Sequence, residues 1–388
     1  MTITRAIVVG AAAFVILAAL GSAQKIETVN GVRLIHNEKG GGWGSRPKVG
    51  IELVRTIGGL DADENLSFRS PYDIGRDSAG NLYILDMGNR QVQKLDSEGK
   101  FIKSIGRPGQ GPGEFQAPFS LDVDRKDLLF VCDSRNMRIQ VFEAAGRPIR
   151  SITLAESGVF LIRRLPSGLI VKGSGPNRRD LLMNPKKIPP LLELIDLDGN
   201  VKKSFGQAMD YKDVLVNSTA NQFALETDGE GNIYLSFWYQ NRIEKYSPEG
   251  ILLWRADRPL NYGTDVIDKG SIRSGERGTT FQVPKMNMVS LGVAVDGKGR
   301  VWVNTYNRQM SPDEEGMSVS AGGAQRTSRE PKNTLMDVYK LEIFNPAGVL
   351  LGEIPLNHRA HGLRIFGDNL FIWERNDTTY YQYKVVEK

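Results

Sequence analysis

The feature that most constrains this chain is a repeat of short apolar runs that begins at Pro71. The first copy, Pro71 to Ile105, holds four runs in which apolar and polar residues alternate, separated by turns rich in Asp, Ser, Gly and Asn. Alternation with period two predicts half-buried β-strands joined by hairpin turns. The second copy follows without an insertion, so equivalent residues lie 47 positions apart: Pro71/Pro118, Asp86/Asp133, Asn89/Asn136 and Gly99/Gly146. The chain is therefore a repeat protein.

Four further units follow downstream, over residues 160–200, 228–250, 292–348 and 363–385. The last unit has only three strands, whereas Ile51–Ile57 resembles a fourth strand that lacks its first three. We expect residues 51–57 to join the last unit, because a closed ring leaves no open sheet edge. Radial repetition of four-stranded antiparallel sheets is a β-propeller. The sequence thus predicts an all-β, six-bladed propeller over residues 51–388.

Seven blades is the alternative, because residues 250–348 cover about two repeat lengths. Residues 256–289 contain no Gly-x-apolar-aromatic-apolar signature, however, so we interpret this region as one blade with insertions.

The N-terminal residues have a different character. Arg5, an apolar run from Ala6 to Leu20 and the small residues 21–23 are typical of a signal peptide cleaved after Ala23. The apolar run is shorter than the roughly 20 residues of a membrane span, although an uncleaved anchor is the alternative. Residues 24–50 are predicted to form an extension with a hairpin around Asn30-Gly31 and a flexible link at 40–44. We expect a periplasmic or extracellular protein.

Charge and cysteine content narrow the function classes. The net charge of +5 is mild for a chain of 388 residues and does not indicate a nucleic-acid surface. Cys132 is the only cysteine, so no internal disulfide can form, and its apolar strand pattern predicts a buried thiol. We expect a monomer that contacts a membrane only through an uncleaved signal segment.

The best repeats resemble a known family. The motif Gly80-Asn81-Leu82-Tyr83-Ile84-Leu85-Asp86 with Asn89-Arg90, followed by the glycine-rich run 109–115, resembles exported bacterial six-bladed propellers of the NHL-repeat type. This resemblance implies the propeller fold and a binding role, and it implies no particular reaction.

Strand order predicts where a ligand binds. In each blade, the connection into the first strand and the loop between strands two and three share one face. All long segments belong to that face: 106–118, 173–190, 257–284 and 309–336. Loops beyond about 12–15 residues are usually functional or disordered. We therefore expect a protein, peptide or glycan ligand to bind on the loop-rich face.

Four arginines recur on that face just before the third strand: Arg90, Arg138, Arg242 and Arg308. One interpretation is a basic ring for an anionic ligand. The other is architectural, in which Asp86/Asn89 and Asp133/Asn136 bond to their own turn backbone and the arginines cover neighbouring blades.

An enzyme is the alternative function. Gluconolactonase-like propellers hold a divalent ion in the channel, and the predicted inner positions here are Asp73, Ser120, Asn221, Gln222 and Gly292. Amidating lyases of the NHL type bind zinc through histidines, of which this chain has only His36, His358 and His361. Zinc sites need three or four converging ligands. The leading hypothesis is therefore binding without catalysis or cofactor. The alternative is a Ca²⁺- or Zn²⁺-assisted hydrolase or lyase with Asp73 and His361 at the channel mouth.

Overall fold

The computed structural model describes residues 24–59, 62–155, 158–176, 178–184, 187–275, 278–311, 314 and 337–388. The predicted signal peptide (1–23) and most of the insert 309–336 lie outside these residues. Across the described ranges, no helix combines the length and apolar character needed to cross a membrane.

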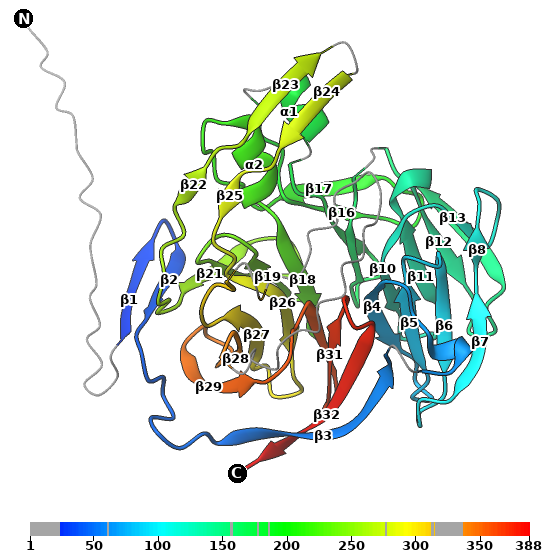
Figure 1. Ribbon diagram of the computed structural model, residues 1–388, viewed down its shortest axis with the longest axis horizontal. Helices are drawn as coiled ribbons and strands as arrows, with labels where there is room; N and C mark the ends of the chain where they lie inside the picture. Colours follow the sequence, from blue (N-terminus) through cyan, green and yellow to red (C-terminus); the bar gives the residue numbers. More distant parts are fainter. Residues whose placement is uncertain are drawn as a thin grey trace, which may run out of the picture.

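Six four-stranded antiparallel sheets follow one another around a ring (Figure 1), which confirms the six-bladed propeller. Blade 1 is β4 (Pro71–Arg76), β5 (Leu82–Asp86), β6 (Gln91–Leu95) and β7 (Phe101–Ile105). Blade 2 is β10 (Pro118–Val123), β11 (Leu129–Asp133), β12 (Arg138–Phe142) and β13 (Pro148–Thr153). Blade 3 is β14 (Leu161–Arg164), β15 (Ile170–Gly173), β16 (Leu192–Ile195) and β17 (Val201–Phe205).

The second half of the ring has the same plan. Blade 4 is β18 (Phe223–Thr227), β19 (Ile233–Phe237), β20 (Ile243–Tyr246) and β21 (Leu252–Asp257). Blade 5 is β26 (Ser290–Val295), β27 (Val301–Tyr306), β28 (Tyr339–Phe344) and β29 (Leu350–Leu356). Blade 6 is β30 (Gly362–Phe366), β31 (Asn369–Glu374), β32 (Thr379–Glu387) and β3 (Val49–Gly58). The region after residue 250 thus forms one blade, as the sequence predicts.

The closing strand is confirmed. The strand β3, longer than the predicted 51–57, pairs antiparallel with β32 from Val49–Glu387 to Gly58–Thr379. In Figure 1 it runs in blue beside the red C-terminal strand. The last sheet therefore combines strands from both ends of the chain.

The first turn of each clear blade is held by an aspartate. Asp77 accepts hydrogen bonds from the Asn81 backbone N–H (2.8 Å) and the Tyr83 hydroxyl (3.1 Å). Blades 4 and 5 repeat this arrangement with Asp228 and Tyr234, and with Asp296 and Trp302. Each aspartate thereby links its turn to a buried aromatic residue of the second strand. The Gly-Asn-x-Tyr signature in the sequence is mainly this structural contact.

The N-terminal extension packs on the propeller. The strands β1 (Gln24–Val29) and β2 (Val32–Asn37) form the predicted hairpin, with Asn30 and Gly31 at positive φ. Unexpectedly, β2 pairs in parallel with β21 and extends blade 4 to six strands. The prediction of a flexible link at 40–44 was wrong. Backbone N–H groups of Gly42 and Trp43 donate to Leu350 and Leu351 (2.9 and 2.7 Å), because the missing side chain of Gly352 lets the Trp43 ring pack closely.

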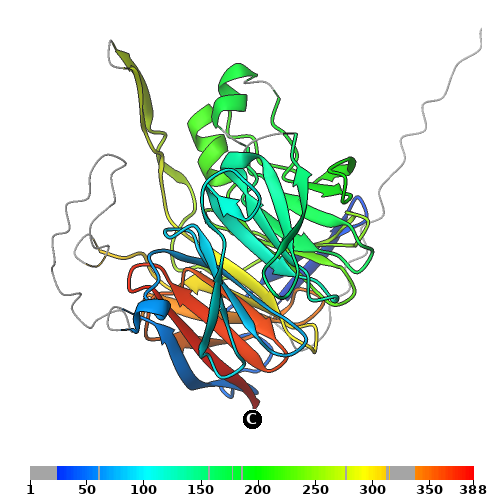
Figure 2. The same ribbon diagram turned by 90° about the vertical axis from the view of Figure 1, so that its right-hand side faces the viewer.

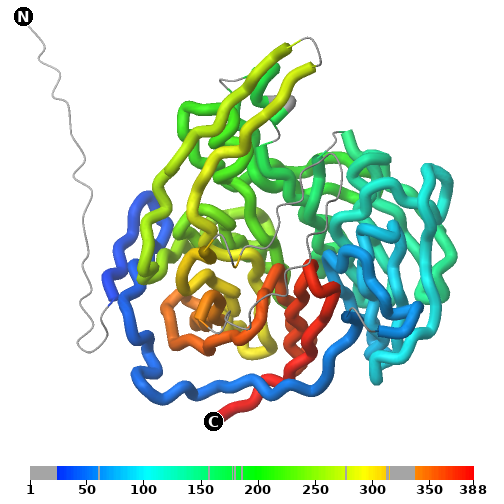
Figure 3. The backbone as a smooth tube through the Cα atoms, in the orientation of Figure 1, coloured from blue at the N-terminus to red at the C-terminus, as the bar shows by residue number. Residues whose placement is uncertain are grey.

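The long insertions carry short elements of their own. They are η1 (Glu64–Leu66), η2 (Ser134–Asn136), α1 (Arg178–Met183), α2 (Val214–Ala220), β8 (Arg107–Pro108), β9 (Glu114–Phe115), β22 (Val266–Asp268), β23 (Ser271–Gly275), β24 (Gly278–Gln282) and β25 (Lys285–Met286). Figures 2 and 3 show the β23–β24 hairpin projecting from the ring as an arm on the same side as α1 and α2. The region 257–284, expected to be a loop, is thus largely a β-arm. Cys132 is fully buried, as predicted, and burial raises the pKa of its thiol to about 12.

Candidate ligand-binding site

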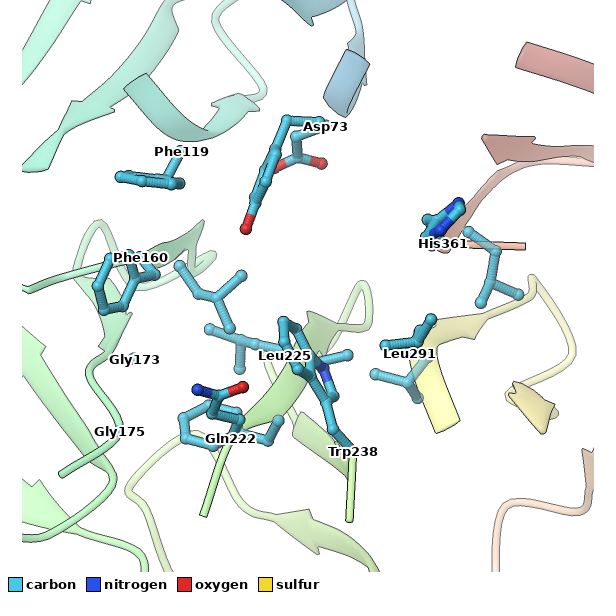
Figure 4. Close-up of a pocket in the computed structure, with 18 of the residues that line it drawn as sticks. Asp73, Phe119, Phe160, Gly173, Gly175, Gln222, Leu225, Trp238, Leu291 and His361 are labelled. Atoms are coloured by element: carbon cyan, nitrogen blue, oxygen red, sulfur yellow. The ribbon is translucent and has the colours of Figure 1, made fainter. Parts of the chain in front are cut away.

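A pocket of about 400 Å³ lies at the loop-rich mouth of the channel. Every blade contributes the beginning of its inner strand to the lining, and α1 and α2 add Arg178 and Ser218. Figure 4 shows Asp73, Phe119, Gln222, Trp238 and His361 around this space. The pocket thus lies on the face where strand order predicts ligand binding, and binding itself stays a prediction. The sequence did not name most of the residues that line the pocket.

A shared β-bulge directs side chains to the pocket. The register of the inner strand shifts at Tyr72 in blade 1, at Phe119 in blade 2 and at Leu291 in blade 5. A bulge adds one residue to a strand and re-aims its side chain. All three bulge residues line the pocket. The 47-residue spacing of Tyr72 and Phe119 was the sequence signal that could have identified them.

The bulge residues begin a row of aromatic rings. Tyr72 meets Phe119 edge to face at 5.4 Å between ring centroids, and Phe119 meets Phe160 at 5.0 Å. Phe160 is 40% exposed, so its ring is open to a ligand. The row offers aromatic surface to a ligand across three blades.

Two arginines of the pocket lining lie over aromatic rings, one in the row and one on the arm, without an acidic partner among the described residues. The Arg375 guanidinium lies 4.0 Å over the Tyr72 ring, and that of Arg178 lies 4.7 Å over Phe281 on the arm. Among the described residues, neither has a carboxylate within ion-pairing distance, and neither Nε has a hydrogen-bond partner. The indole N–H groups of Trp238 and Trp373 also have none in this part of the chain. Trp373 is 6% exposed, and its ring packs where a side chain at Gly362 would otherwise lie.

His361 is held neutral at the same wall. Its Nδ1 accepts from the Arg375 backbone N–H at 3.2 Å, which assigns the ring proton to Nε2. Burial, followed by the charges of Arg375 and Arg359, lowers the pKa of His361 to about 3. General bases work best with a pKa near the operating pH, so this environment does not favour that role. The ring instead offers an Nε2–H donor.

Asp73 lies at the floor of the pocket, and its carboxylate is held by hydrogen bonds and an ion pair within the protein. It accepts hydrogen bonds from Ser120 Oγ (2.9 Å) and the Leu121 N–H (3.1 Å), and it pairs with Arg163 at 3.0 Å. Its buried charge is thus neutralised within the protein.

A layer of paired charges lies below Asp73, which we term the central ion network: Asp122, Arg163, Glu226 and Arg364. The first three occupy equivalent register positions, opposite Phe130, Val171 and Tyr234 of their second strands. Arg163 Nε and Arg364 Nε lie 3.3 and 3.0 Å from Glu226, and Arg364 lies 3.1 Å from Asp122. All four side chains are buried. Sequence reasoning missed this network, since its members come from four blades with no common spacing.

The prediction that Asn221 and Gln222 share the inner position of Asp73 was wrong. The register places Ala224 there, opposite Ser236, because helix α2 shifts the start of the strand. Asn221 instead ties down the backbone of Met209. Gln222 does line the pocket and points into it in Figure 4.

None of the four recurrent arginines lines the pocket. Arg138 donates to the carbonyls of Gly111 and Glu114. Arg242 is buried against Glu244 (2.8 Å), Arg308 pairs with Glu314 and Asp337 (2.7 and 2.6 Å), and Arg90 is exposed. The structure therefore does not gather them into one basic ring at the pocket. Asp86 and Asp133 accept from the Asn89 and Asn136 side chains of their own turns. Their closest backbone donors, however, belong to the link that enters the blade, at residues 69–70 and 116–117. The contacts are thus architectural, but they tie two segments together and do not only close one turn.

The three histidines do not converge. His36 bonds to Asp257 and joins the N-terminal hairpin to blade 4, and His358 stacks on Tyr381 at 3.9 Å. Within the described residues, no group of three His, Cys, Asp or Glu side chains is arranged to hold a metal ion.

Comparisons with known proteins agree on the fold. Residues 60–170 match the model of the DUF5128 family, described as a 6-bladed beta-propeller. A DUF4221 family member from Bacteroides vulgatus superposes with a TM-score of 0.57 at 11% identity, covering 88% of this chain and 99% of that one. A protein from Bacteroides fragilis described as exported gives 0.58 at 11% identity, covering 92% and 99%. The chain is a six-bladed β-propeller.

A third solved structure, the PQQ-bound aldose sugar dehydrogenase from Streptomyces coelicolor, gives a TM-score of 0.50 at 12% identity and covers 87% and 99%. A search of curated proteins found no match. At these identities the likeness concerns the fold alone. The NHL character of the repeats stays a prediction.

Proposed function

We propose that this propeller is an exported binding module that holds a protein, peptide or glycan in the mouth pocket, without catalysing a reaction. The observation that carries the proposal is that the pocket lining combines apolar aromatic rings with a few charged and polar groups. Aromatic faces line the pocket beside two arginines, Arg178 and Arg375, that have no carboxylate partner among the described residues. Small-ligand sites likewise combine apolar walls with a few placed polar groups.

The environment of Asp73 and His361 weighs against the enzymatic alternative. A metal-binding carboxylate needs free oxygen lone pairs, whereas Asp73 already accepts from Ser120, Leu121 and Arg163. A general base needs a pKa near neutrality, whereas that of His361 is lowered to about 3 by burial and two arginines. Both residues line the pocket, but neither has the properties that the alternative assigns to it.

Filling the pocket tests the proposal. Gln222→Trp places a large ring in the space without removing a hydrogen bond of the described structure. We expect the wild-type protein to capture a ligand from immobilised glycan and peptide libraries, and Gln222→Trp to lose that ligand. Glu98→Trp is the matched control, since it adds the same side chain to an exposed turn on the opposite face. Equal capture by Gln222→Trp and the control would place the ligand elsewhere and sink the proposal.

Export has its own test. Mass spectrometry of the protein purified from its native host is expected to show a mature N-terminus at Gln24. A chain that begins at Met1 or Thr2 would instead indicate an uncleaved anchor or no export.

A further inference from the structure

The pocket lining has more positive than negative side chains, which favours an anionic ligand. Four ionised side chains line the pocket: Asp73, Arg163, Arg178 and Arg375. Asp73 and Arg163 neutralise each other at 3.0 Å. Arg163 also pairs with Glu226, so Asp73 and the central ion network together hold three carboxylates and two guanidinium groups. The carboxylates of Asp122 and Glu226 lie in the layer below and are not part of the lining. Two guanidinium groups therefore remain at the mouth, and a negatively charged ligand would balance them.

The hydrogen-bonding groups near the Arg375 side of the pocket are mostly donors. Trp373 Nε1, Arg375 Nε and Trp238 Nε1 are donors without partners among the described residues, and the assigned His361 tautomer adds another. Trp373, Arg375 and His361 are neighbours on one wall, through the His361–Trp373 and Arg375–His361 backbone contacts. A buried donor without an acceptor is costly. The indole nitrogens and Arg375 Nε are themselves buried. Arg375 as a whole is only half-buried and lines the pocket, so this wall offers its guanidinium group to an oxygen acceptor such as a carboxylate.

The aromatic row, in contrast to the Arg375 wall, suits an apolar part of the ligand. Tyr72, Phe119 and Phe160 present ring surface next to the Arg375 wall, since Arg375 itself stacks on Tyr72. Aromatic faces bind the flat apolar side of a ring. Gln222 adds a side-chain amide that points into the pocket and can both donate and accept. The volume of about 400 Å³ lies near the lower end of small-ligand pockets, about 300–1,000 Å³, and suits the end of a chain rather than its middle.

Together these features describe an anionic sugar. We infer that the pocket binds the end of an acidic oligosaccharide, with a sugar carboxylate at Arg375 and the sugar ring against Phe119 and Phe160. This inference rests on the proposed function and specifies its ligand class. Guanidinium and carboxylate groups can form two parallel hydrogen bonds, which gives both affinity and orientation.

The test uses calorimetric titration of the purified protein with a uronic acid trisaccharide and with its methyl ester, which has the same rings but no charge. We expect the acid to bind at least tenfold more tightly than the ester, and its affinity to fall as salt increases. Arg375→Gln should reduce affinity for the acid at least tenfold and leave affinity for the ester unchanged. Arg46→Gln is the control, since this arginine is exposed and lies outside the pocket.

Several outcomes would overturn the inference. Equal binding of acid and ester would remove the anionic requirement while leaving pocket binding intact. Benzoate binding as tightly as the trisaccharide would indicate an aromatic acid instead of a sugar. Binding of none of these probes, with library capture still blocked by Gln222→Trp, would reject the sugar and retain the binding module. Arg375→Lys guards against a folding defect, because it keeps the charge but loses the bidentate geometry.

Discussion

Two pairs of arginines near the propeller axis have opposite surroundings. Arg163 and Arg364 lie in the central ion network and contact carboxylates from other blades at 3.0–3.3 Å. Arg178 and Arg375 lie one level higher, on aromatic faces, with no carboxylate partner in the described residues. Burying a charge is expensive unless it is paired. The paired arginines therefore hold blades together, and the unpaired ones leave their charge available to a ligand.

The largest expected effect comes from removing a paired arginine. Arg163→Met leaves Asp73 and Glu226 buried without one of their cations. Breaking a buried ion pair on one side costs about 3–5 kcal/mol, so we expect the free energy of unfolding to fall by that amount. Urea denaturation measures it. The double variant Arg163→Met/Asp73→Asn should recover part of the loss, and a loss below about 1 kcal/mol in the single variant would contradict the assigned role of the network.

A smaller effect is expected from pH through His361. Its pKa is about 3 in the folded protein and about 6.5 in an unfolded chain. Between these values only the unfolded state binds the proton, so stability falls as pH drops below about 6.5. We expect His361 to contribute a loss of about 2 kcal/mol between pH 7 and pH 5.

The comparison with His361→Asn isolates this contribution, since Asn keeps an acceptor for the Arg375 N–H. Burial raises the pKa of nearby Glu374 to about 8. Its titration therefore changes the free energy of unfolding with pH in the opposite direction to that of His361. This contribution of Glu374 is the same in the wild type and in His361→Asn, so it cancels when the two free energies of unfolding are subtracted. Parallel stability curves for the two proteins over pH 5–7 would show that His361 titrates normally in the fold.

The smallest effect on stability is expected from an unpaired arginine. Arg375→Gln removes a cation–π contact worth about 0.5–1 kcal/mol at partly exposed sites, so thermal unfolding should shift only slightly. Its main consequence should be lost affinity for an anionic ligand. A stability loss as large as that of Arg163→Met would mean that Arg375 is structural, and the contrast between the two pairs would fail.

The sequence predicts the architecture far better than the site. Repeat spacing is enough to identify the blades, the closing strand and the loop-rich face, because each depends on local patterns. The pocket depends on contacts between blades, which leave no spacing in the sequence. Asp73 and His361 were found since they occupy recognisable strand positions. Arg375 and Trp373 lie in the least regular blade, where no repeat marks them. Gln222 was named from the sequence and does line the pocket, but at a different register from the predicted one, because helix α2 lies directly before the strand.

The pairing of β3 with β32 also has a consequence for the order in which the parts of the propeller can fold. The strand β3 precedes blades 1 to 5 in the chain, and its partner β32 follows all of them. Closing so long a loop costs entropy that local contacts cannot offset beforehand. Each of blades 1 to 5 takes its four blade strands from one stretch of the chain and can form as the chain grows, whereas the ring cannot be sealed until β32 has been synthesised. We therefore expect sealing to be a late event of folding, and the mouth pocket, which all six blades line, to be completed only then.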